Sequence, residues 1–172
     1  MSLATRIGWL LHAHRAGITL ARSTRIDPFA VLSLKHGGTI SIGERTSIGL
    51  GAMIAPYGGS VRIGSDSSVN PYSVLYGHGG LEIGNFVRIA AHTVIIPANH
   101  GFGDRDTPIA KQPLDAKGVT IEDDVWIGTG VSILDGVKIA KGSVIGAGSV
   151  VTKSTEPYGI YVGNPARLVK FR

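Results

Sequence analysis

The feature that most constrains the fold is a repeat of six residues. From residue 121 the sequence reads IEDDVW IGTGVS ILDGVK IAKGSV IGAGSV VTKSTE, with an aliphatic residue opening every block. The fifth place of the first five blocks holds Val125, Val131, Val137, Ser143 and Ser149. A period of six is neither the 3.6 of a helix nor the simple alternation of a long strand. It predicts a short strand followed by a corner, repeated along the chain.

The same repeat runs earlier, in groups of three blocks. The opening residues are Ile42, Ile48 and Ile54, then Ile63, Val69 and Leu75, then Ile83, Ile89 and Ile95. Each group is an eighteen-residue coil with a small insertion, at "PYGG" and at "HGG". Three strands per coil predict a triangular prism of stacked coils, in which each opening aliphatic side chain points to the axis.

One long insertion interrupts the repeat. The segment between His100 and Gly118, GFGDRDTPIAKQPLDAKG, fits no block, and its Pro, Gly and polar residues predict a loop over residues 101–118. Long excursions from a compact scaffold are often functional. His100 stands at the root of this loop and is therefore a candidate catalytic base, although a lone histidine is more often a solvated or packing residue.

Composition limits the function classes. The chain has 172 residues, enough for one domain, and no cysteine, which excludes a disulfide framework and a cysteine nucleophile and favours the reducing cytoplasm. A net charge of +5 suits an anionic ligand or the inner face of a membrane, whereas scattered basic residues without a reading motif do not predict nucleic-acid binding. The N-terminal run IGWLLHAHRAGITLA is too short to span a bilayer. We therefore expect an arm or capping helix at residues 1–25 and the repeat domain at residues 26–172.

Three stretches resemble a known family. They are "NH" before the loop, VTIEDDVWIGTGVSILDGVKIAKGSVIGAGSVVTK after it, and PYGIYVGNPARLVKFR at the end. Over about residues 40–172 the chain resembles the hexapeptide-repeat acyltransferases, in particular sugar O-acetyltransferases similar to those acting on galactosides, maltose and surface polysaccharides. The resemblance implies an all-β, left-handed parallel β-helix. The left hand comes from the resemblance alone, because β-crossovers are ordinarily right-handed.

The resemblance also implies roles for four residues near the reaction. His100 matches the general base that takes the proton from the acceptor hydroxyl as it attacks the thioester of acetyl-CoA. Asn70 matches a residue that binds the acceptor or the developing oxyanion, although an asparagine in "SVNPY" also suits a plain corner. Thr129 matches a backbone N–H that holds the oxyanion. Trp126 matches an aromatic residue beside the substrate cleft, and would otherwise be an exterior packing residue.

For the donor, the resemblance implies a groove between neighbouring subunits of a homotrimer. Ala147 matches a backbone contact to pantetheine. Thr152, Lys153 and Arg167 match positions near the nucleotide end, where cations would meet phosphates. Each of these is, taken alone, also an ordinary surface residue.

The predicted function is an acetyl-CoA-dependent O-acetyltransferase that acts on a sugar hydroxyl in surface polysaccharide or glycan biosynthesis, by direct transfer without a metal. One alternative changes the acceptor to the amine of a nucleotide-linked amino sugar, or to serine. Another is a zinc carbonic anhydrase of the same fold, for which His78, His92 and His100 would have to converge, although their spacings are not coil multiples. A third is a structural or ice-binding prism, which would need no loop and would show regular threonine ladders.

Overall fold

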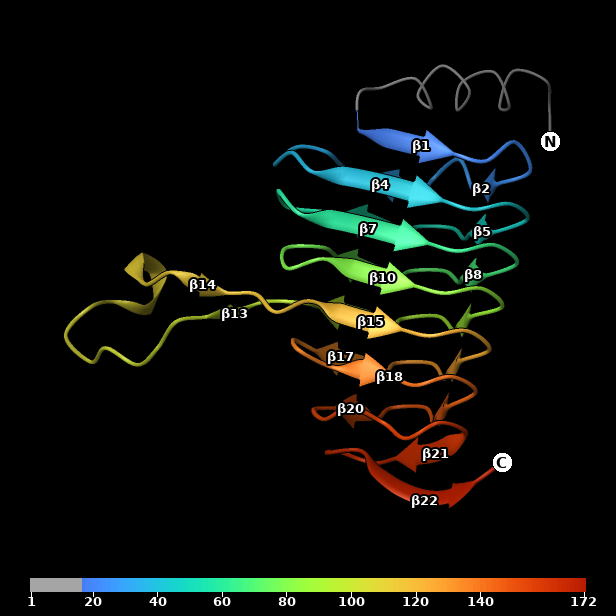
Figure 1. Cartoon of the computed structure of the whole chain (residues 1–172). Coiled ribbons are helices and arrows are strands. Elements are labelled where there is room, and N and C mark those ends of the chain that lie inside the picture. Colours follow the sequence, from blue (N-terminus) through green and yellow to red (C-terminus); the bar gives the residue numbers. More distant parts are fainter. Residues whose placement is uncertain (1–16) are drawn as a thin grey trace.

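The computed structural model describes residues 17–172 and shows a parallel β-solenoid (Figure 1). Each coil contributes one short strand to each of three sheets, which form the faces of a prism. The first sheet contains β1 (Ile18–Leu20), β4 (Thr39–Ile42), β7 (Ser60–Ile63), β10 (Leu81–Ile83), β15 (Val119–Ile121) and β18 (Lys138–Ile139).

The second sheet contains β2 (Arg25–Ile26), β5 (Ser47–Ile48), β8 (Ser68–Val69), β11 (Arg88–Ile89), β16 (Trp126–Ile127), β19 (Val144–Ile145), β21 (Gly159–Val162) and β22 (Arg167–Phe171). The third sheet contains β3 (Val31–Leu32), β6 (Met53–Ala55), β9 (Val74–Tyr76), β12 (Val94–Ile96), β17 (Ser132–Leu134) and β20 (Val150–Val151). Within the three sheets all pairings are parallel except that of β21 with β22, where the chain reverses at its C-terminal end.

The predicted six-residue register is confirmed. On the first sheet the paired residues from coil to coil are Ile42, Ile63, Ile83, Ile121 and Ile139. On the second sheet they are Ile48, Val69, Ile89, Ile127 and Ile145. Each opening aliphatic therefore stacks on its equivalent in the next coil.

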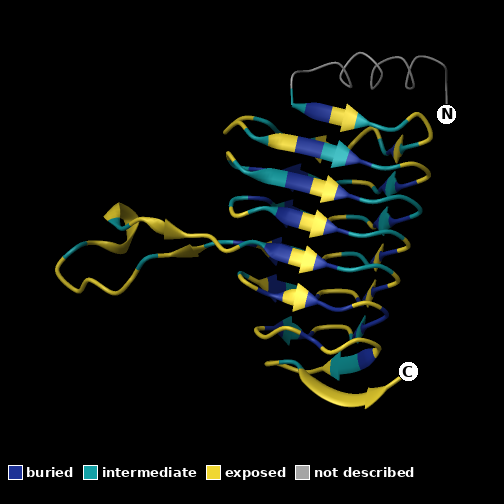
Figure 2. Cartoon of the chain, viewed as in Figure 1, coloured by how far each residue is buried: buried dark blue, intermediate teal, exposed yellow. Residues whose placement is uncertain are grey.

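The core is the axis of the prism, where these aliphatic side chains are buried (Figure 2). Neighbouring residues point outward, as the alternation of strand side chains requires. Burial of each such side chain stabilises the fold by about 1.5–3 kcal/mol. The serines at the fifth place of the six-residue blocks, such as Ser143, are also buried. Their hydroxyl groups form hydrogen bonds at the corners; that of Ser143 donates to the backbone oxygen of Glu156 at 3.1 Å. Burial of these polar residues is thereby offset by hydrogen bonds.

The solenoid begins earlier than the boundary that the sequence predicts. Strand β1 pairs with β4, and Leu20, Ile26 and Leu32 are in register with the first predicted group. A complete coil therefore precedes residue 42 and starts inside the segment expected to be an arm. The rest of that predicted arm or helix, residues 1–16, lies outside the described residues.

The corners between sheets form three edges. We call the corner from first to second sheet the first edge, that from second to third sheet the second edge, and that from third to first sheet the third edge. The long loop leaves the third edge after β12 and returns at β15. It carries β13 (Asn99–His100), a short 3₁₀-helix η1 (Ile109–Lys111) and β14 (Leu114–Asp115), and it projects away from the prism (Figure 1). Within residues 17–172, no helix has the length and apolarity needed to cross a bilayer.

Candidate active site

His100 lies at the root of the projecting loop. Strand β13 pairs antiparallel with β14, which places His100 opposite Leu114. The returning end of the loop is fixed by Asp135, whose Oδ1 accepts hydrogen bonds from the backbone N–H groups of Lys117 and Gly118, both at 2.9 Å. His100 itself is exposed, so its imidazole is accessible to a substrate.

The tip of the loop is organised by Gln112. Its Nε2 donates to the backbone oxygens of Asp104 and Thr107, both at 2.8 Å, and its Oε1 accepts from the N–H of Asp104 at 3.2 Å. Three large apolar side chains of the loop are exposed, namely Phe102, Ile109 and Leu114. The loop therefore has an ordered backbone but presents apolar side chains outward.

Three of the predicted site residues lie on the second edge. Asn70 follows β8, and its Nδ2 donates to the backbone oxygen of Ile89 in the next coil at 2.7 Å. Thr129 follows β16, and its Oγ1 donates to the backbone oxygen of Ala91 at 2.7 Å. Ala147 occupies the equivalent corner of the following coil. The side chains of Asn70 and Thr129 thus fix the corner, which for Asn70 is the structural interpretation that the sequence also allowed.

The second edge also carries a row of available backbone donors. The N–H groups of Ala91, Thr129 and Ala147, at equivalent positions in successive coils, have no acceptor among the described residues. Gly128 permits this close stacking, because a Cβ there would lie 2.6 Å from the nitrogen of Ala147. Such a row can donate hydrogen bonds to an oxyanion or to amide carbonyls of a bound chain.

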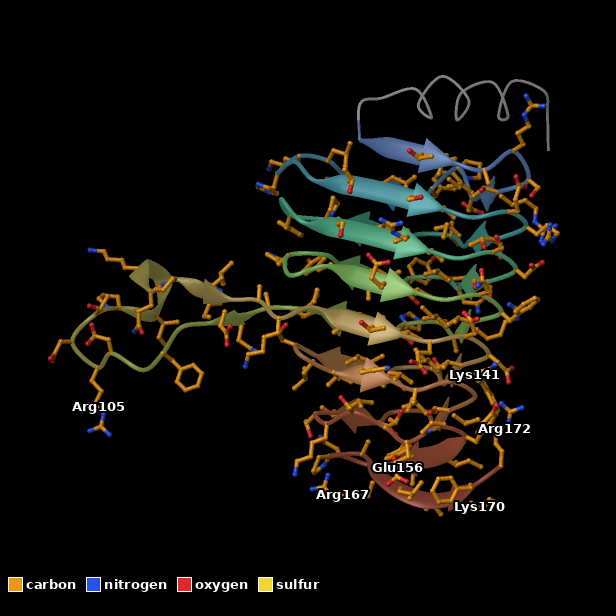
Figure 3. The ribbon with its side chains drawn as sticks, viewed as in Figure 1. Arg105, Lys141, Glu156, Arg167, Lys170 and Arg172 are labelled. Atoms are coloured by element: carbon orange, nitrogen blue, oxygen red, sulfur yellow. The ribbon has the colours of Figure 1, made fainter. Side chains whose placement is uncertain are left out.

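The remaining donor-site candidates lie toward the C-terminal end. Thr152 and Lys153 follow β20 on the third edge and are exposed. Arg167 is the first residue of β22 and pairs with Val162 of β21. The Val162 side chain packs against Gly146, a second-edge residue next to Ala147, so Arg167 lies near the second edge. Figure 3 shows Arg167, Lys170 and Arg172 gathered around this end. Both edges therefore carry cationic groups on the same, C-terminal, side of the prism.

Trp126 lies on the outer surface of the second sheet, between its register partners Arg88 and Val144. Its side chain is 57% exposed. Within one chain it therefore neither packs in the core nor lies on the edge that carries His100.

A single chain does not bring His100 and Asn70 together. Asn70 precedes the third-sheet strand of its coil and His100 follows the third-sheet strand of the next one, so the width of the third sheet separates them. At roughly 3.3 Å per residue, six extended residues span about 20 Å. The residues predicted to be catalytic therefore lie on two different edges of one chain, and we call these two positions the half-sites.

The three histidines do not form a common cluster. His92 lies at a second-edge corner, stacked on Tyr72 with ring centroids 5.5 Å apart. His78 lies on the third edge near His100. It is half-buried. Burial, with smaller contributions from His100 and His36, lowers the pKa of His78. The convergence that a three-histidine zinc site requires is not found within residues 17–172.

Two features near His100 were not predicted. One is Asp135, which anchors the loop. The other is a cluster of rings formed by His36, Tyr57, Tyr76 and His78, which we call the ring cluster. A signal for it is visible in the sequence, because the inserted corners read HGG, YGG and HGG, each with a ring before two glycines.

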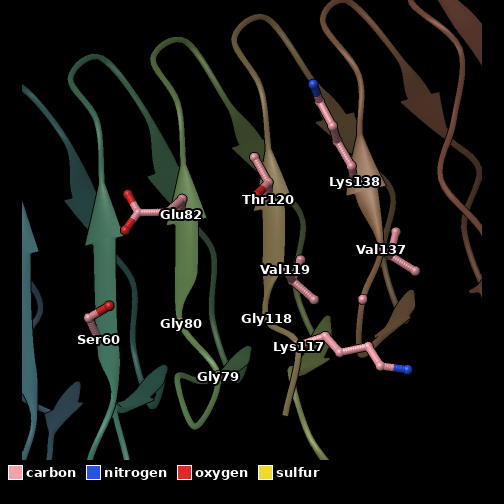
Figure 4. Close-up of a pocket in the computed structure, with 11 residues that line it drawn as sticks. Ser60, Gly79, Gly80, Glu82, Lys117, Gly118, Val119, Thr120, Val137 and Lys138 are labelled. Carbon is pink, nitrogen blue, oxygen red and sulfur yellow. The ribbon is translucent and has the colours of Figure 1, made fainter.

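A shallow groove of about 420 Å³ runs across the first sheet beside the returning end of the loop (Figure 4). Its charged lining residues are Glu82, Lys117 and Lys138. No predicted site residue lines this groove, and it is open to solvent on a nearly flat sheet. His100 and the second-edge N–H groups that lack an acceptor among the described residues lie instead at the edges.

Comparisons with known proteins identify the family to which the repeat belongs. The sequence pattern of the bacterial transferase hexapeptide (six repeats) matches residues 118–153. The chain is 30% identical over 157 residues to the "Putative lipopolysaccharide biosynthesis O-acetyl transferase WbbJ" of Escherichia coli K12, covering 87% of this chain and 80% of that protein. The chain is also 34% identical over 139 residues to a probable acetyltransferase of Mycobacterium tuberculosis. This match covers 81% of this chain but only 44% of that longer protein.

A solved structure extends the comparison. AntD, an N-acyltransferase from Bacillus cereus in complex with dTDP and coenzyme A, has a TM-score of 0.81 at 27% identity, covering 100% of this chain and 90% of AntD. Another AntD structure contains dTDP-4-amino-4,6-dideoxyglucose and coenzyme A.

Proposed function

The chain belongs to the hexapeptide-repeat acyltransferases, and we propose that it transfers an acetyl group from acetyl-CoA to a sugar hydroxyl. The observation that carries the proposal is the position of His100, an accessible imidazole at the root of the one long loop of the solenoid. A left-handed winding of the coils belongs to the same proposal.

The active site is completed by a second copy of the chain. The second edge carries, from the N-terminal to the C-terminal side, Asn70, Thr129, Ala147 and Arg167. The third edge carries His100 and then Lys153 in the same direction. Packed side by side in a homotrimer, the second edge of one copy and the third edge of its neighbour would form one groove, with the reacting groups at one end and the cations at the other.

The loop supports this arrangement. It projects from the third edge with three exposed apolar side chains, Phe102, Ile109 and Leu114. Burial of such side chains against a neighbouring copy is favourable, by about 25 cal/mol per Å² of apolar surface. Closed cyclic symmetry would then repeat the same contact at every interface.

The chemistry of the site is direct acyl transfer. His100 takes the proton of the acceptor hydroxyl while that oxygen attacks the thioester carbon. The N–H of Thr129 and the amide of Asn70 donate hydrogen bonds to the oxyanion that develops. When the C–S bond breaks, the His100 imidazolium returns the proton to the sulfur of coenzyme A. Lys153 and Arg167 bind the phosphates of the donor.

A specific observation favours a second acceptor class. AntD, whose structure covers the whole chain, is an N-acyltransferase with an amino-sugar nucleotide bound in one of its complexes. The alternative product would be an amide, which survives mild alkali, whereas an acetyl ester of a sugar is hydrolysed. The stability of the product to alkali therefore separates the two reactions.

The test has two steps. The first is a calorimetric titration of the purified chain with coenzyme A, for which we expect about one bound molecule per chain. The second is the release of the coenzyme A thiol from acetyl-CoA in the presence of sugars, measured for wild type and for His100→Ala. We expect the variant to keep its affinity for coenzyme A and to lose about 10²- to 10⁴-fold in rate. A protein that does not bind coenzyme A, or a His100→Ala variant with the wild-type rate, would exclude the proposal.

A further inference from the structure

The ring cluster is a continuous stack along the third edge. Tyr57 lies at its centre, stacked on His36 with centroids 5.0 Å apart and on His78 at 4.5 Å, with interplanar angles of 13° and 5°. Tyr76 meets Tyr57 and His78 edge-on, at 4.7 Å and 5.8 Å. The centroid separations and ring orientations of these four pairs are those of favourable aromatic contacts.

The cluster adjoins the root of the loop that carries His100. The N–H of Gly79, next to His78, donates to the backbone oxygen of Pro97 at 3.2 Å. On the returning side, a Cβ added at Gly79 would lie 2.6 Å from the nitrogen of Gly118. The corner that holds His78 is thus packed against both ends of the loop, and His100 is close enough to influence the titration of His78.

The rings lie on one side of His100 only. The coils before the loop have lengthened third-edge corners at residues 33–38, 56–59 and 77–80, which supply His36, Tyr57 and His78, and Tyr76 ends β9 just before the last of them. After the loop, the corner between β17 and β18 is the tight pair Asp135–Gly136, without an aromatic residue. The C-terminal side is where the proposed donor residues lie, so the ring cluster faces the opposite side of the reaction centre.

Core packing does not account for the ring cluster. Tyr57, Tyr76 and His78 are only half-buried, and His36 is exposed. The Nδ1 atom of His78 is buried and has no hydrogen-bond partner among the described residues. Because an unpaired buried polar atom destabilises a fold, stability alone does not favour histidine at this position.

The chemistry of the rings specifies a ligand class. Tyrosine and histidine combine apolar ring surface with hydroxyl and nitrogen groups that donate or accept hydrogen bonds. The four side chains include no carboxylate, ammonium or guanidinium group. Such a surface suits a neutral ring with both C–H and hydroxyl groups, and offers no counter-charge for a phosphate or an amine.

We infer that the ring cluster is the acceptor-binding wall of the active site and that it holds a neutral pyranose ring against His100. This inference rests on the proposed acetyl transfer. It adds that the acceptor enters from the N-terminal side of the loop, opposite the donor. Asn70 of a neighbouring copy would lie at the same level, because Asn70 and His78 flank the same third-sheet strand, β9.

The experiment compares three variants in the same assay. Tyr57→Leu removes the ring that contacts all three others, and Tyr57→Phe keeps the ring but removes its hydroxyl. Phe86→Leu is the matched control, because Phe86 is also an aromatic corner residue with a positive φ, 58° against 49° for Tyr57, but it is exposed and lies on the first edge. The probes are the methyl glycosides of glucose, galactose, mannose and N-acetylglucosamine, and the same sugars linked to a nucleoside diphosphate.

We expect Tyr57→Leu to raise the KM for the accepted sugar about tenfold or more, the loss typical of a stacking contact, with the KM for acetyl-CoA unchanged. Tyr57→Phe should keep most of the affinity, and Phe86→Leu should match wild type. Saturation-transfer NMR should show the same loss of sugar binding without turnover. An unchanged KM for the sugar in a folded Tyr57→Leu variant would overturn the inference. So would a protein that binds coenzyme A but acetylates no sugar on the panel, whereas failure to bind coenzyme A would overturn the proposed function itself.

Discussion

Asn99 donates a hydrogen bond from Nδ2 to Oδ2 of Asp135 at 3.4 Å. The other carboxylate oxygen of Asp135 holds the backbone N–H groups of Lys117 and Gly118. One side chain from the following coil therefore ties the outgoing and returning ends of the loop together. Asn99 immediately precedes His100, so this contact sets the direction in which the histidine leaves the solenoid.

The first prediction concerns Asp135. Asp135→Ala should lower the free energy of unfolding by about 1–3 kcal/mol, because two backbone donors lose their acceptor. It should also lower kcat by about tenfold or more, because His100 is no longer held in position. Chemical denaturation and steady-state kinetics measure the two effects.

The matched control for Asp135 is Asp123→Ala. Asp123 plays the same structural role on the first edge, where its Oδ1 accepts from the N–H of Asn85 at 2.7 Å. This variant should lose similar stability but keep the wild-type kcat. Equal loss of kcat in both variants would show that Asp135 acts through stability alone.

The second prediction concerns the two half-sites. If His100 of one copy works with Asn70 of its neighbour, His100→Ala and Asn70→Ala should each be nearly inactive, yet mixed assemblies of the two should regain activity. A mixed cyclic trimer of either composition has one complete site, so about one site in three of the doubly purified assemblies would contain both wild-type residues. The measurement is the rate of co-expressed, differently tagged variants purified through both tags. No recovery in a verified mixed assembly would contradict a site that two copies share.

Much of this fold could be predicted because the repeat is redundant. Each opening aliphatic is buried and pairs with equivalents on both sides, so a single error in the pattern is corrected by its neighbours. The start of the first coil was missed because Leu32 and Ile42 are ten positions apart, which interrupts the repeat, although Leu20, Ile26 and Leu32 are six apart. His100 could be predicted because the repeat breaks beside it.

The ring cluster and the half-sites depend on information that the repeat lacks. Stacking of Tyr57 on His78 requires the inserted corners of two coils to overlap, and their lengths alone do not set side-chain direction. Asn70 and His100 were both predicted as site residues, but only the order of strands around the prism shows that they lie on different edges. Asp135 sits in an ordinary corner sequence, "LDGV", which carries no sign of its contact with a loop seventeen residues earlier.

The third prediction uses the pKa of His78, which burial, His100 and His36 hold below its ordinary value of 6.5. Between the two pKa values the unfolded chain binds more protons than the folded chain. Stability conferred by the neutral imidazole is therefore present above about pH 6.5 and is lost as the pH falls through the folded pKa. Urea denaturation of wild type between pH 7.5 and 5 should show this loss, and His78→Asn should reduce the slope. Parallel curves for the two proteins would contradict the prediction.

The fourth prediction concerns the core. Ile89→Ala, at a fully buried axial position in the middle of the solenoid, should lower the free energy of unfolding by about 2–5 kcal/mol. Glu82→Ala, which removes an exposed ion pair with Arg62 at 3.2 Å, should cost less than about 1 kcal/mol. Denaturant titration of the two variants measures both losses in the free energy of unfolding. Similar small losses would mean that the axis is less tightly packed than the burial of Ile89 indicates.

The last prediction concerns the donor cations. Lys153 and Arg167 lie on different edges of one chain, and in the proposed assembly they would meet one donor molecule across two copies. The double variant Lys153→Ala, Arg167→Ala should weaken coenzyme A binding by about 5- to 20-fold, since hydrogen bonds to charged groups contribute about 1.5–3 kcal/mol when well formed and less when solvated. Dephospho-coenzyme A should be affected less, because it lacks one of the phosphates. Arg62→Ala, on the first sheet, is the control and should bind like wild type in calorimetry at low salt. If the double variant binds coenzyme A as wild type does, the phosphates of the donor are not held at this end of the edges.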